Sequence, residues 1–347
     1  MDIHDKDTVN SKTVILDVGS GCIRAGISGE EGPTVEIPNV IAISKPSLLN
    51  PISQTLIGEE AEEKKPVAYD IIYPVKKGLI TDLDALFKVL DEVLLNRMAL
   101  DTSKCKIIFA AECPDKDKLL DALFEKYNPT EIFLTNQDFL SLCASGLSDG
   151  LVVNFGEGTS HVTPFIENKE VLQEMNNAYS WGCNGRDLTE KLMDMLKISK
   201  TPQGLKCARE ILKEHCFVVP DPKESKEPIE PIPYKVDDEQ QITISGEQLK
   251  CPEMIFQDFH IQNVIVKAIN NCEEKYREAL IKNIVLAGEC TMLNGFPERL
   301  KNEIKTLVGD ETEVNIIAPE DRHHSAWKGG ARVASEGLFP NNWTTKK

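Results

Sequence analysis

The sequence of 347 residues lacks the features that mark several large classes of protein. It has no apolar run approaching the roughly 20 residues that a membrane-spanning helix needs. Its polar, acidic first residues, MDIHDKDTVNSK, do not resemble a secretory signal. Its ten cysteines form no CxxC pair and no Cys/His cluster at zinc spacing, so we expect reduced, buried thiols and no structural zinc site. These absences favour a cytosolic or nuclear protein.

Basic charge is also scarce in this chain. It has 39 Lys and Arg against 56 Asp and Glu, a formal net charge of −17, and the acidic excess is spread along the sequence. Nucleic-acid binding needs a basic surface that neutralises phosphates, so the composition argues against it. An acidic surface favours solubility and partners with basic surfaces. A soluble acidic protein without a special partner is compatible with the same composition.

What the sequence does contain is an alternation of strand and helix patterns in two batches. The first batch starts near Thr13 and the second near Gly150, and each opens with hairpin-like strands before helices and strands alternate. This order predicts an α/β fold with two similar halves, which the length allows. Helices are predicted at residues 82–98, 115–127, 137–145, 186–196, 203–215 and 295–307. Strands predicted with less regular patterns include 34–43, 170–175 and 313–319, and surface loops are predicted at 44–55 and 219–241.

Each half opens with a strand that runs into a Gly-x-Gly turn, LDVGSGCI at 16–23 and GLVVNFGEGTSH at 150–161. Glycine leaves the backbone N–H groups of such a turn free to converge on a phosphate. Neither turn is a Walker A loop, and no helix follows GSG as a dinucleotide fingerprint requires. One such turn is typical of a tight hairpin, but two that open duplicated halves predict a polyphosphate held between them, with Asp17 near a metal ion. The glycine element at 284–296 would contact the rest of the ligand.

These motifs resemble those of actin and the actin-related proteins, in the superfamily that also contains sugar kinases and Hsp70 ATPase domains. The resemblance runs in order from about Thr13 to Lys346 and includes YPVKKGLITDLDAL, QDFLSLCASG, GRDLTEKLM, ISGEQLKCPEMIFQ and IIAPEDRHHSAWKGGARVAS. It implies two duplicated actin-like, ribonuclease H-like α/β domains with four subdomains around a nucleotide cleft. The implied first domain is 1–143 plus 325–347, with subdomain 2 at 39–73; the second is 144–324, with subdomain 4 at 184–258.

The resemblance implies that the ligand is ATP or ADP with Mg²⁺ or Ca²⁺. Asp17 and Asn154 lie at the family's metal positions, where a cation keeps part of its hydration shell. The residues at nucleotide-contacting positions are Gly19, Ser20, Gly21, Cys22, Arg24, Gly156, Glu157, Gly158, Thr159, Gly185, Arg209, Lys213, Gly288, Glu289, Met292 and His323. Gln137 and His161 match the glutamine and histidine that orient the attacking water for in-line phosphoryl transfer.

The chain departs from the family pattern at several of these positions. Asn154 replaces an aspartate, and its amide can accept a hydrogen bond from a metal-bound water but carries no charge. Glu289 and Cys290 replace a glycine and a threonine, and His323 replaces a lysine. We therefore expect ATP binding with slow hydrolysis, and we expect Asn154→Asp to accelerate phosphate release. Lys77 takes the place of the family's modified histidine, so we expect no such modification.

The resemblance also implies head-to-tail filaments of a cytoplasmic, cytoskeletal protein, with partners of the actin-binding type and no membrane. Leu48, Leu49 and Ile52 are candidate contact residues. The segment 256–272 is several residues shorter than in the family, and the sequence ends soon after Trp343 without the family's terminal helix. A non-filamentous actin-related subunit of a larger assembly, cytoplasmic or nuclear, with structural nucleotide, therefore stays open. So does a small-molecule kinase, although its acidic base would be expected where the chain has a glutamine.

Overall fold

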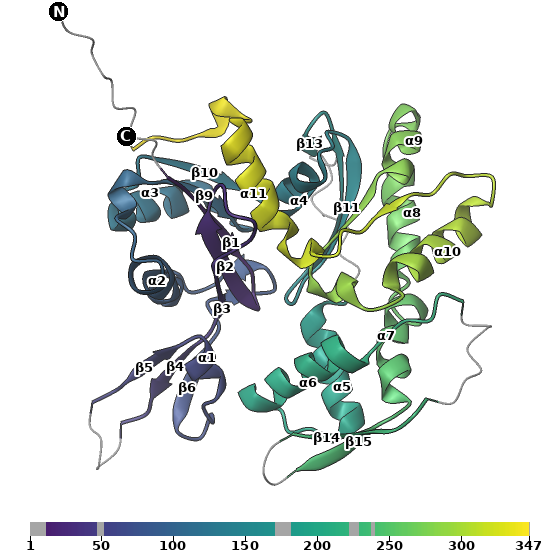
Figure 1. Ribbon diagram of the computed structural model, residues 1–347, viewed down its shortest axis with the longest axis horizontal. Coiled ribbons are helices and arrows are strands. Elements are labelled where there is room, and N and C mark those ends of the chain that lie inside the picture. Colours follow the sequence, from purple (N-terminus) through teal and green to yellow (C-terminus); the bar gives the residue numbers. More distant parts are fainter. Residues whose placement is uncertain (1–11, 47–51, 171–181, 222–228, 237–239, 347) are drawn as a thin grey trace, which may run out of the picture.

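The computed structural model describes residues 12–46, 52–170, 182–221, 229–236 and 240–346. Two halves, each built around its own sheet, lie side by side, and the helices α4 (Gln137–Ser145) and α11 (Ser325–Glu336) lie between them (Figure 1). The C-terminal segment lies against the first half, where Thr344 pairs with Ile132. The α/β fold with two sheet-based domains that the sequence predicts is confirmed.

The two five-stranded sheets have the same topology. Their strand orders are β10-β9-β1-β2-β3 and β17-β16-β11-β12-β13. In each sheet an antiparallel hairpin comes first, a third strand extends it on one side, and two later strands add in parallel on the other. The duplication inferred from the order of elements is therefore present in the sheets. Their strands are β1 Thr13–Val18, β2 Cys22–Ile27, β3 Val35–Pro38, β9 Lys106–Ala110, β10 Glu131–Thr135, β11 Gly150–Phe155, β12 Ser160–Ile166, β13 Lys169–Glu170, β16 Ile284–Ala287 and β17 Ile316–Ile317.

The first sheet is covered on both faces. Because side chains alternate along a strand, Val14 and Leu16 of β1 pack on the side of α2 and α3, whereas Ile15 packs with α4 and α11. A small sheet of β4, β5 and β6 projects from this half (Figure 1). The remaining elements are β4 Ile41–Ser44, β5 Thr55–Ile57, α1 Glu59–Glu62, β6 Tyr69–Ile72, β7 Val75–Lys76, β8 Leu79–Ile80, α2 Leu83–Asp91, the π-helical turn η1 Glu92–Arg97, η2 Thr102–Lys104 and α3 Lys116–Tyr127.

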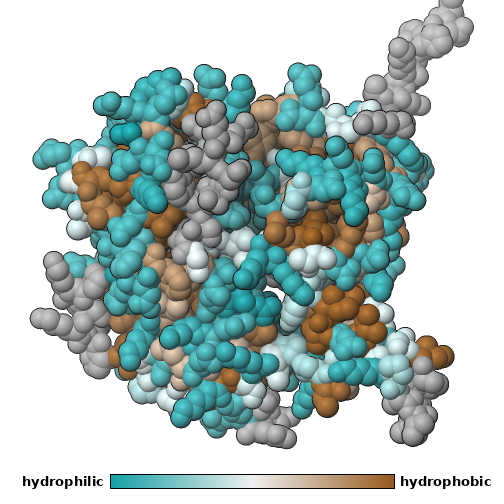
Figure 2. All heavy atoms as spheres, turned by 180° about the vertical axis from the view of Figure 1, so that it is seen from behind, coloured by the Kyte–Doolittle hydropathy of each residue, from teal (hydrophilic) through white to brown (hydrophobic). Residues whose placement is uncertain are grey.

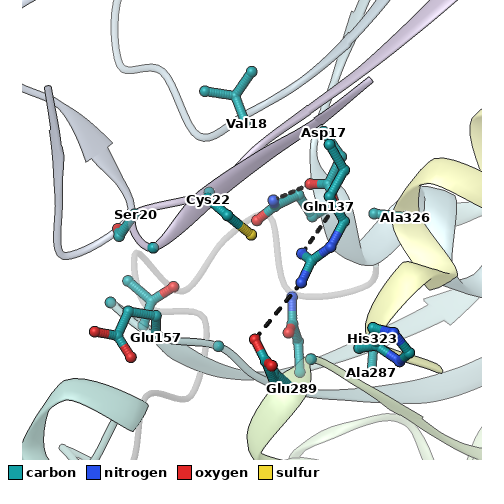
Figure 3. Close-up of a pocket in the computed structure, with 18 of the residues that line it drawn as sticks. Asp17, Val18, Ser20, Cys22, Gln137, Glu157, Ala287, Glu289, His323 and Ala326 are labelled. Atoms are coloured by element: carbon teal, nitrogen blue, oxygen red, sulfur yellow. Dashed lines mark hydrogen bonds and ion pairs between the residues drawn. The ribbon is translucent and has the colours of Figure 1, made fainter. Parts of the chain in front are cut away.

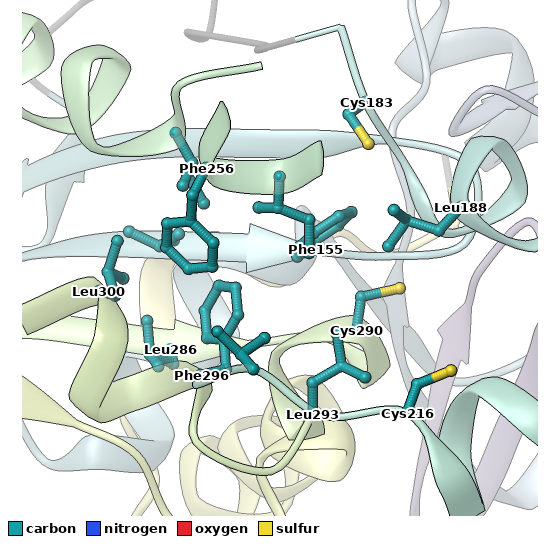
Figure 4. Packing of buried hydrophobic residues seen from close by; sticks show 14 of the residues in the cluster. Phe155, Cys183, Leu188, Cys216, Phe256, Leu286, Cys290, Leu293, Phe296 and Leu300 are labelled. Atoms are coloured by element: carbon teal, nitrogen blue, oxygen red, sulfur yellow. The ribbon is translucent and has the colours of Figure 1, made fainter. Parts of the chain in front are cut away.

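The second sheet packs against a core rich in phenylalanine and cysteine (Figure 4). Phe155 of β11 and Phe296 have ring centroids 6.5 Å apart, and Phe256 lies 5.6 Å from Phe296. All ten cysteines are free thiols, as expected. The elements around this core are α5 Gly185–Leu196, α6 Pro202–His215, β14 Ile232–Lys235, β15 Gln241–Ile244, α7 Glu247–Gln257, α8 Ile261–Asn271, α9 Glu274–Lys282, η3 Glu289–Met292, α10 Phe296–Val308, η4 Arg322–His324 and η5 Pro340–Asn342.

The helices α4 and α11 join the two halves through a shared core. A Cβ at Gly329 would overlap the carbonyl oxygen of Leu140, and a Cβ at Gly330 would lie 2.7 Å from Cγ2 of Ile15. Glycine therefore permits the close approach of the two helices to each other and to β1. One cluster of buried side chains includes residues of both sheets and both helices, with Trp327 fully buried.

Most predicted elements are confirmed within a few residues, and several need correction. The run 34–43 forms two strands in different sheets, because the chain turns tightly between them, where Val40 N–H donates to the carbonyl of Pro38 at 2.9 Å. The prediction of a loop at 219–241 is wrong for its C-terminal part, because β14 forms there, pairs with β15 and packs against the core of the second half. In the run 313–319 only two residues pair, and most of 170–175 lies outside the described residues. The helices α1, α7, α8, α9 and α11 and the short strands β5, β6, β7 and β8 were not predicted from the sequence.

The surface carries scattered hydrophobic areas. On the face in Figure 2, brown areas are separated by hydrophilic side chains and do not form one continuous band. Large exposed apolar side chains include Ile52, 78% exposed, and Val67, 83% exposed, both close to the small sheet. Leu48 and Leu49, predicted contact residues, lie outside the described residues. Across the described ranges, the helices are all too short or too polar to cross a bilayer.

Candidate functional site

The first glycine loop, residues 19–21, turns between β1 and β2. The backbone N–H of Gly19 donates to the carbonyl of Cys22 across 3.0 Å and closes the turn. Asn39, buried just after β3, supports the loop from outside. Its Nδ2 donates to the carbonyl of Gly19 at 2.8 Å, and its backbone N–H donates to the carbonyl of Gly21 at 3.0 Å. The protein itself therefore fixes the shape of this loop, and sequence reasoning did not identify Asn39.

The second glycine loop, residues 156–159, turns between β11 and β12. The start of α5 supports it, since Gly185 N–H donates to the carbonyl of Gly156 at 2.9 Å and Arg186 N–H donates to that of Glu157 at 2.8 Å. Helix α5 begins at this point because Asn184 caps it with a capping box. Gly185 thus holds the second loop in place.

The two loops touch each other across the cleft between the halves. A Cβ at Gly158 would overlap the hydroxyl of Ser20, and a Cβ at Gly21 would lie 3.0 Å from Cβ of Glu157. A methyl group at Gly158 would force Ser20 to shift, and one at Gly21 would force the Glu157 side chain to give by a few tenths of an ångström. The hydroxyl of Ser20 also accepts a hydrogen bond from Gly78 N–H at 3.0 Å, so the β7–β8 hairpin contacts the same point.

A cavity of about 370 Å³ lies between the loops (Figure 3). In Figure 3, Ser20 and Glu157 lie on one side of it, and His323 and Ala326 lie on the other. The sequence-predicted residues that line it are Asp17, Gly19, Ser20, Gly21, Cys22, Arg24, Gln137, Asn154, Gly156, Glu157, Gly158, Thr159, Arg209, Lys213, Gly288, Glu289 and His323. The structure adds lining residues that sequence reasoning missed: Val18, Glu36, Ile37, Pro38, Gly78, Ser141, Ala287, Arg322 and Ala326.

A second cavity of about 300 Å³ adjoins the first. It takes in two more of the predicted residues, Gly185 and Met292, and its walls are more apolar. The two cavities share Glu157, Arg209, Lys213, Glu289 and His323. The apolar side chains that line the second cavity are Leu212, Cys290, Met292 and Leu293. Together the cavities offer a polar compartment beside an apolar one.

Arg24 connects several carboxylates around the polar compartment. Its guanidinium lies 3.7 Å from Asp17, 3.2 Å from Glu36 and 3.7 Å from Glu289, which belongs to the other half. Glu289 also lies 3.5 Å from Nζ of Lys213. Two of the four cationic side chains that line this compartment, Arg24 and Lys213, are thus within reach of Glu289, whose side chain is half exposed.

Gln137 and Asp17 form a direct pair. Asn136 caps α4 by accepting from Phe139 N–H at 2.7 Å, which fixes the first turn of the helix after β10. Gln137, in this turn, donates its Nε2 to Oδ1 of Asp17 (Figure 3). Burial raises the pKa of Asp17, and Arg24 and Gln137 partly oppose this effect.

The next residue of α4, Asp138, makes the corresponding contact with the other half. Its carboxylate accepts hydrogen bonds from Nδ2 of Asn154 and from the hydroxyl of Thr163, both at 2.7 Å. Nδ1 of His161 lies 3.7 Å from it, an ion-pair distance. Burial acts to lower the pKa of His161, but Asp138, with the charges of Glu112 and Glu170, outweighs burial and raises it. Sequence reasoning missed Asp138, because only the packing of α4 against β11 and β12 brings these groups together.

His161 is the predicted site residue that the structure places differently. It does not line either of the two cavities, whereas Gln137 lines the first. The ring lies behind the wall, next to Asp138, on strand β12. Of the two residues expected to orient the attacking water, Gln137 therefore lies in the wall of the cavity and His161 lies in the layer behind it.

Two contacts connect the part of the first half that carries the small sheet to the helices α5 and α6 of the second half. Arg209 of α6 forms an ion pair and hydrogen bond with Glu62 of α1. The guanidinium of Arg186 lies 4.9 Å from the ring centroid of Tyr73 and 3.4 Å from the carboxylate of Glu157. We call Glu62–Arg209 the cross-cleft pair, since it connects the two halves beside both cavities.

Two comparisons with known proteins bear on this arrangement. The sequence model of the actin family, described as "Actin", matches residues 8–204 and 199–347. This chain belongs to the actin family. A relative described as "Actin-like protein", from Neurospora crassa, is 29% identical over 368 residues, which cover 98% of this chain and 95% of the relative. Within the actin family, two similar domains with facing glycine loops are the expected architecture, and the two sheets of this chain have it.

Proposed function

We propose that this actin-family protein binds ATP with a divalent cation between its halves, hydrolyses it slowly and assembles into filaments. The observation that carries the proposal is that two glycine loops, one from each half, meet over a single cavity. Such loops can direct backbone N–H groups at phosphates from both sides. A ligand held by both halves would link its own state to their relative position.

The residues around the cavities fit a nucleotide. Arg24 and Lys213 are two of the four cationic side chains of the polar compartment, and an arginine binds phosphate through a planar fork of donors. The apolar second cavity suits a base. Nδ1 of His323 is buried without a hydrogen-bond partner in the described residues, and this side chain lines both cavities. Burial lowers the pKa of His323 to about 4, with His324 and Arg24 adding to the effect, so the ring is neutral at pH 7 and can accept or donate one hydrogen bond.

The side chains near the loops divide the work of hydrolysis. ATP supplies a terminal phosphoryl group that water can attack. Asp17 would hold the water shell of the cation with a negative charge. Gln137 donates its amide N–H to Asp17, which leaves its carbonyl oxygen to accept a hydrogen bond from a water in the cavity. Orientation of this kind is the main protein contribution to phosphoryl transfer to water.

Two features support slow turnover. Asn154 brings no charge to the cation, so one of the two metal-facing positions is neutral. Glu289 lies within ion-pair reach of Arg24 and Lys213, and it competes with phosphate for them. The same features favour a second candidate, an actin-related subunit that keeps its nucleotide as a structural ligand and forms no filament. The cross-cleft pair Glu62–Arg209, which would hold the halves around a nucleotide, favours it too.

Filament assembly and a cytoskeletal location in the cytoplasm are the parts of the proposal that rest on family membership. Ile52 and Val67 are exposed apolar side chains near the small sheet and are available for a contact between subunits. Purified protein is incubated with Mg-ATP, phosphate release is measured, and samples are pelleted and viewed by electron microscopy. Filaments with slow phosphate release support the proposal. Nucleotide binding without polymer at any protein or salt concentration supports the subunit instead, and sugar-dependent ADP production contradicts both.

A further inference from the structure

Asp138 lies in the first turn of α4 and is only 4% exposed. A buried carboxylate costs free energy unless it is hydrogen-bonded, and this one is held by donors from both β11 and β12. Nδ1 of His161 lies 3.7 Å away, so three polar groups of the second half surround this one acid, placed one layer behind the wall of the cavity.

This carboxylate determines which end of the Asn154 amide faces the cavity. Nδ2 of Asn154 donates to Oδ1 of Asp138, so the amide turns its NH₂ group toward Asp138. Its carbonyl oxygen then lies on the other side, between two glycines of the cavity wall. A Cβ at Gly288 would lie 2.7 Å from this oxygen, and one at Gly156 would lie 4.0 Å from it. Asn154 thus offers the cavity an acceptor and no donor.

We propose that Asp138 is a positioning residue of this cavity: it fixes Asn154 with the carbonyl oxygen toward the ligand and holds Nδ1 of His161 toward α4. The inference rests on the proposed nucleotide function. Asp138 also brings a negative charge close to the place where Asn154 has none. In this arrangement the second half still has a carboxylate near the cation, but the carboxylate is Asp138, which lies in the layer behind the cavity wall.

The test variant is Asp138→Asn, which keeps the size of the side chain. An amide accepts at only one of its two ends, so either Asn154 or the pair of Thr163 and His161 loses its acceptor. The first readout is made on nucleotide-free protein at one fixed pH: the ¹⁵N chemical shifts of the His161 ring, assigned with His161→Gln. The second is phosphate release from Mg-ATP. We expect shifted ring signals and a rate lower by about 10–100-fold, with little change in KM.

Two further variants separate positioning from folding. Thr163→Val keeps the carboxylate but removes one of its hydrogen bonds, and it should cause smaller changes of the same kind even if Asp138→Asn fails to fold. Combining Asp138→Asn with Asn154→Asp exchanges carboxylate and amide. The new amide can then donate to the new carboxylate, whose other oxygen faces the cavity, so phosphate release should recover relative to the single variant.

The matched control is Glu112→Gln. Glu112 interacts with Asp138 and His161 through its negative charge. Glu170 does the same, and Lys116 interacts with Glu112 through a charge of opposite sign. This control removes a charge but none of the hydrogen bonds of Asp138, so it should change the ring signals less than Asp138→Asn does and leave the rate unchanged. Unchanged ring signals in both Asp138→Asn and Thr163→Val, or equal effects of Glu112→Gln, would overturn the inference. If the wild-type protein releases no phosphate, the hydrolysis proposal fails, and the ring signals of the nucleotide-free protein still decide the role of Asp138.

Discussion

The two glycine loops of this protein are built alike but carry their charge in different places. In the first half, the acid Asp17 stands on the strand and the amide Gln137 contacts it from α4. In the second half, the amide Asn154 stands on the equivalent strand and the acid Asp138 contacts it from α4. Gln137 and Asp138, consecutive residues of α4, thus form one acid–amide pair with each half, and acid and amide are exchanged between the two pairs. The comparison teaches that each half can have an acid–amide pair although only the first half has its acid, Asp17, in the cavity wall. In the second half the acid, Asp138, lies behind the wall.

The largest expected effect comes from making the first half as neutral as the second. Asp17→Asn leaves both metal-facing positions as amides, so Mg²⁺-dependent ATP affinity should fall by about 10–100-fold. Calorimetric titration with Mg-ATP measures it, and Asp70→Asn on the exposed strand β6 is the control. Equal affinity of Asp17→Asn and the wild type would show that the first strand does not hold the cation.

The reverse change, Asn154→Asp, makes the second half as acidic as the first, and the structure alters what to expect from it. The sequence favours faster phosphate release, but Asp138 lies 2.7 Å from Nδ2 of Asn154, so the variant would place two carboxylates together. One carboxyl of such a pair has a raised pKa and keeps its proton. The stability that depends on this proton is lost as pH rises through the raised pKa.

We therefore expect Asn154→Asp alone not to accelerate phosphate release and to lose about 1–3 kcal/mol of stability between pH 5 and 8 relative to the wild type. Denaturant unfolding at several pH values and a phosphate-release assay measure the two effects. A faster enzyme with unaltered pH dependence of unfolding would contradict the contact between Asn154 and Asp138.

A smaller effect is expected where the two halves meet away from the loops. Glu62→Ala removes the cross-cleft pair between the buried Glu62 and the partly exposed Arg209. Release of a fluorescent ATP analogue should become about 3- to 10-fold faster, a change of ~1 kcal/mol. Glu60→Ala, an exposed change on the same helix, should leave the rate as it is. No acceleration in Glu62→Ala would mean that opening of the halves does not limit release.

The smallest effect concerns Glu36 beside the first loop. A hydrogen bond with His324, together with Arg24, outweighs burial and lowers the pKa of Glu36 from 4.5 to about 2. A depressed carboxyl pKa stabilises the folded state above the unfolded value, and this contribution is lost as pH falls from 4.5 toward 2. The stability difference between wild type and Glu36→Gln, at most ~1 kcal/mol for a half-exposed group, should shrink over that window. A difference constant from pH 6 to 3 would contradict the shift.

Much of the site could be predicted because its residues lie in local sequence patterns. A strand followed by Gly-x-Gly and then by a second strand pattern is typical of a hairpin, so both loops and the residues within them were identifiable. The capping residues Asp82 and Asn136 likewise start α2 and α4 where the sequence indicates. Asn39 and Asp138 escaped prediction because their roles come from contacts between segments far apart in the chain.

Three of the missed helices, α7, α8 and α11, have local signals that contradict their structure. Pro252 lies inside α7, where its missing N–H normally ends a helix. α8 is rich in β-branched Val and Ile, which favour strands, and α11 contains two adjacent glycines. Burial overrides these preferences: Gly329 and Gly330 are required where α11 meets α4 and β1.

The central prediction is that both glycine loops hold the same nucleotide. Calorimetric titration of Mg-ATP into the wild type, Gly158→Ala and Gly32→Ala tests it. A Cβ at Gly158 overlaps Ser20 of the opposite loop, whereas a Cβ at Gly32 meets nothing within 4 Å. We predict one-to-one binding to the wild type and Gly32→Ala, and affinity at least about tenfold weaker in Gly158→Ala. Absence of binding to the wild type, or equal affinity in all three folded proteins, would contradict the claim.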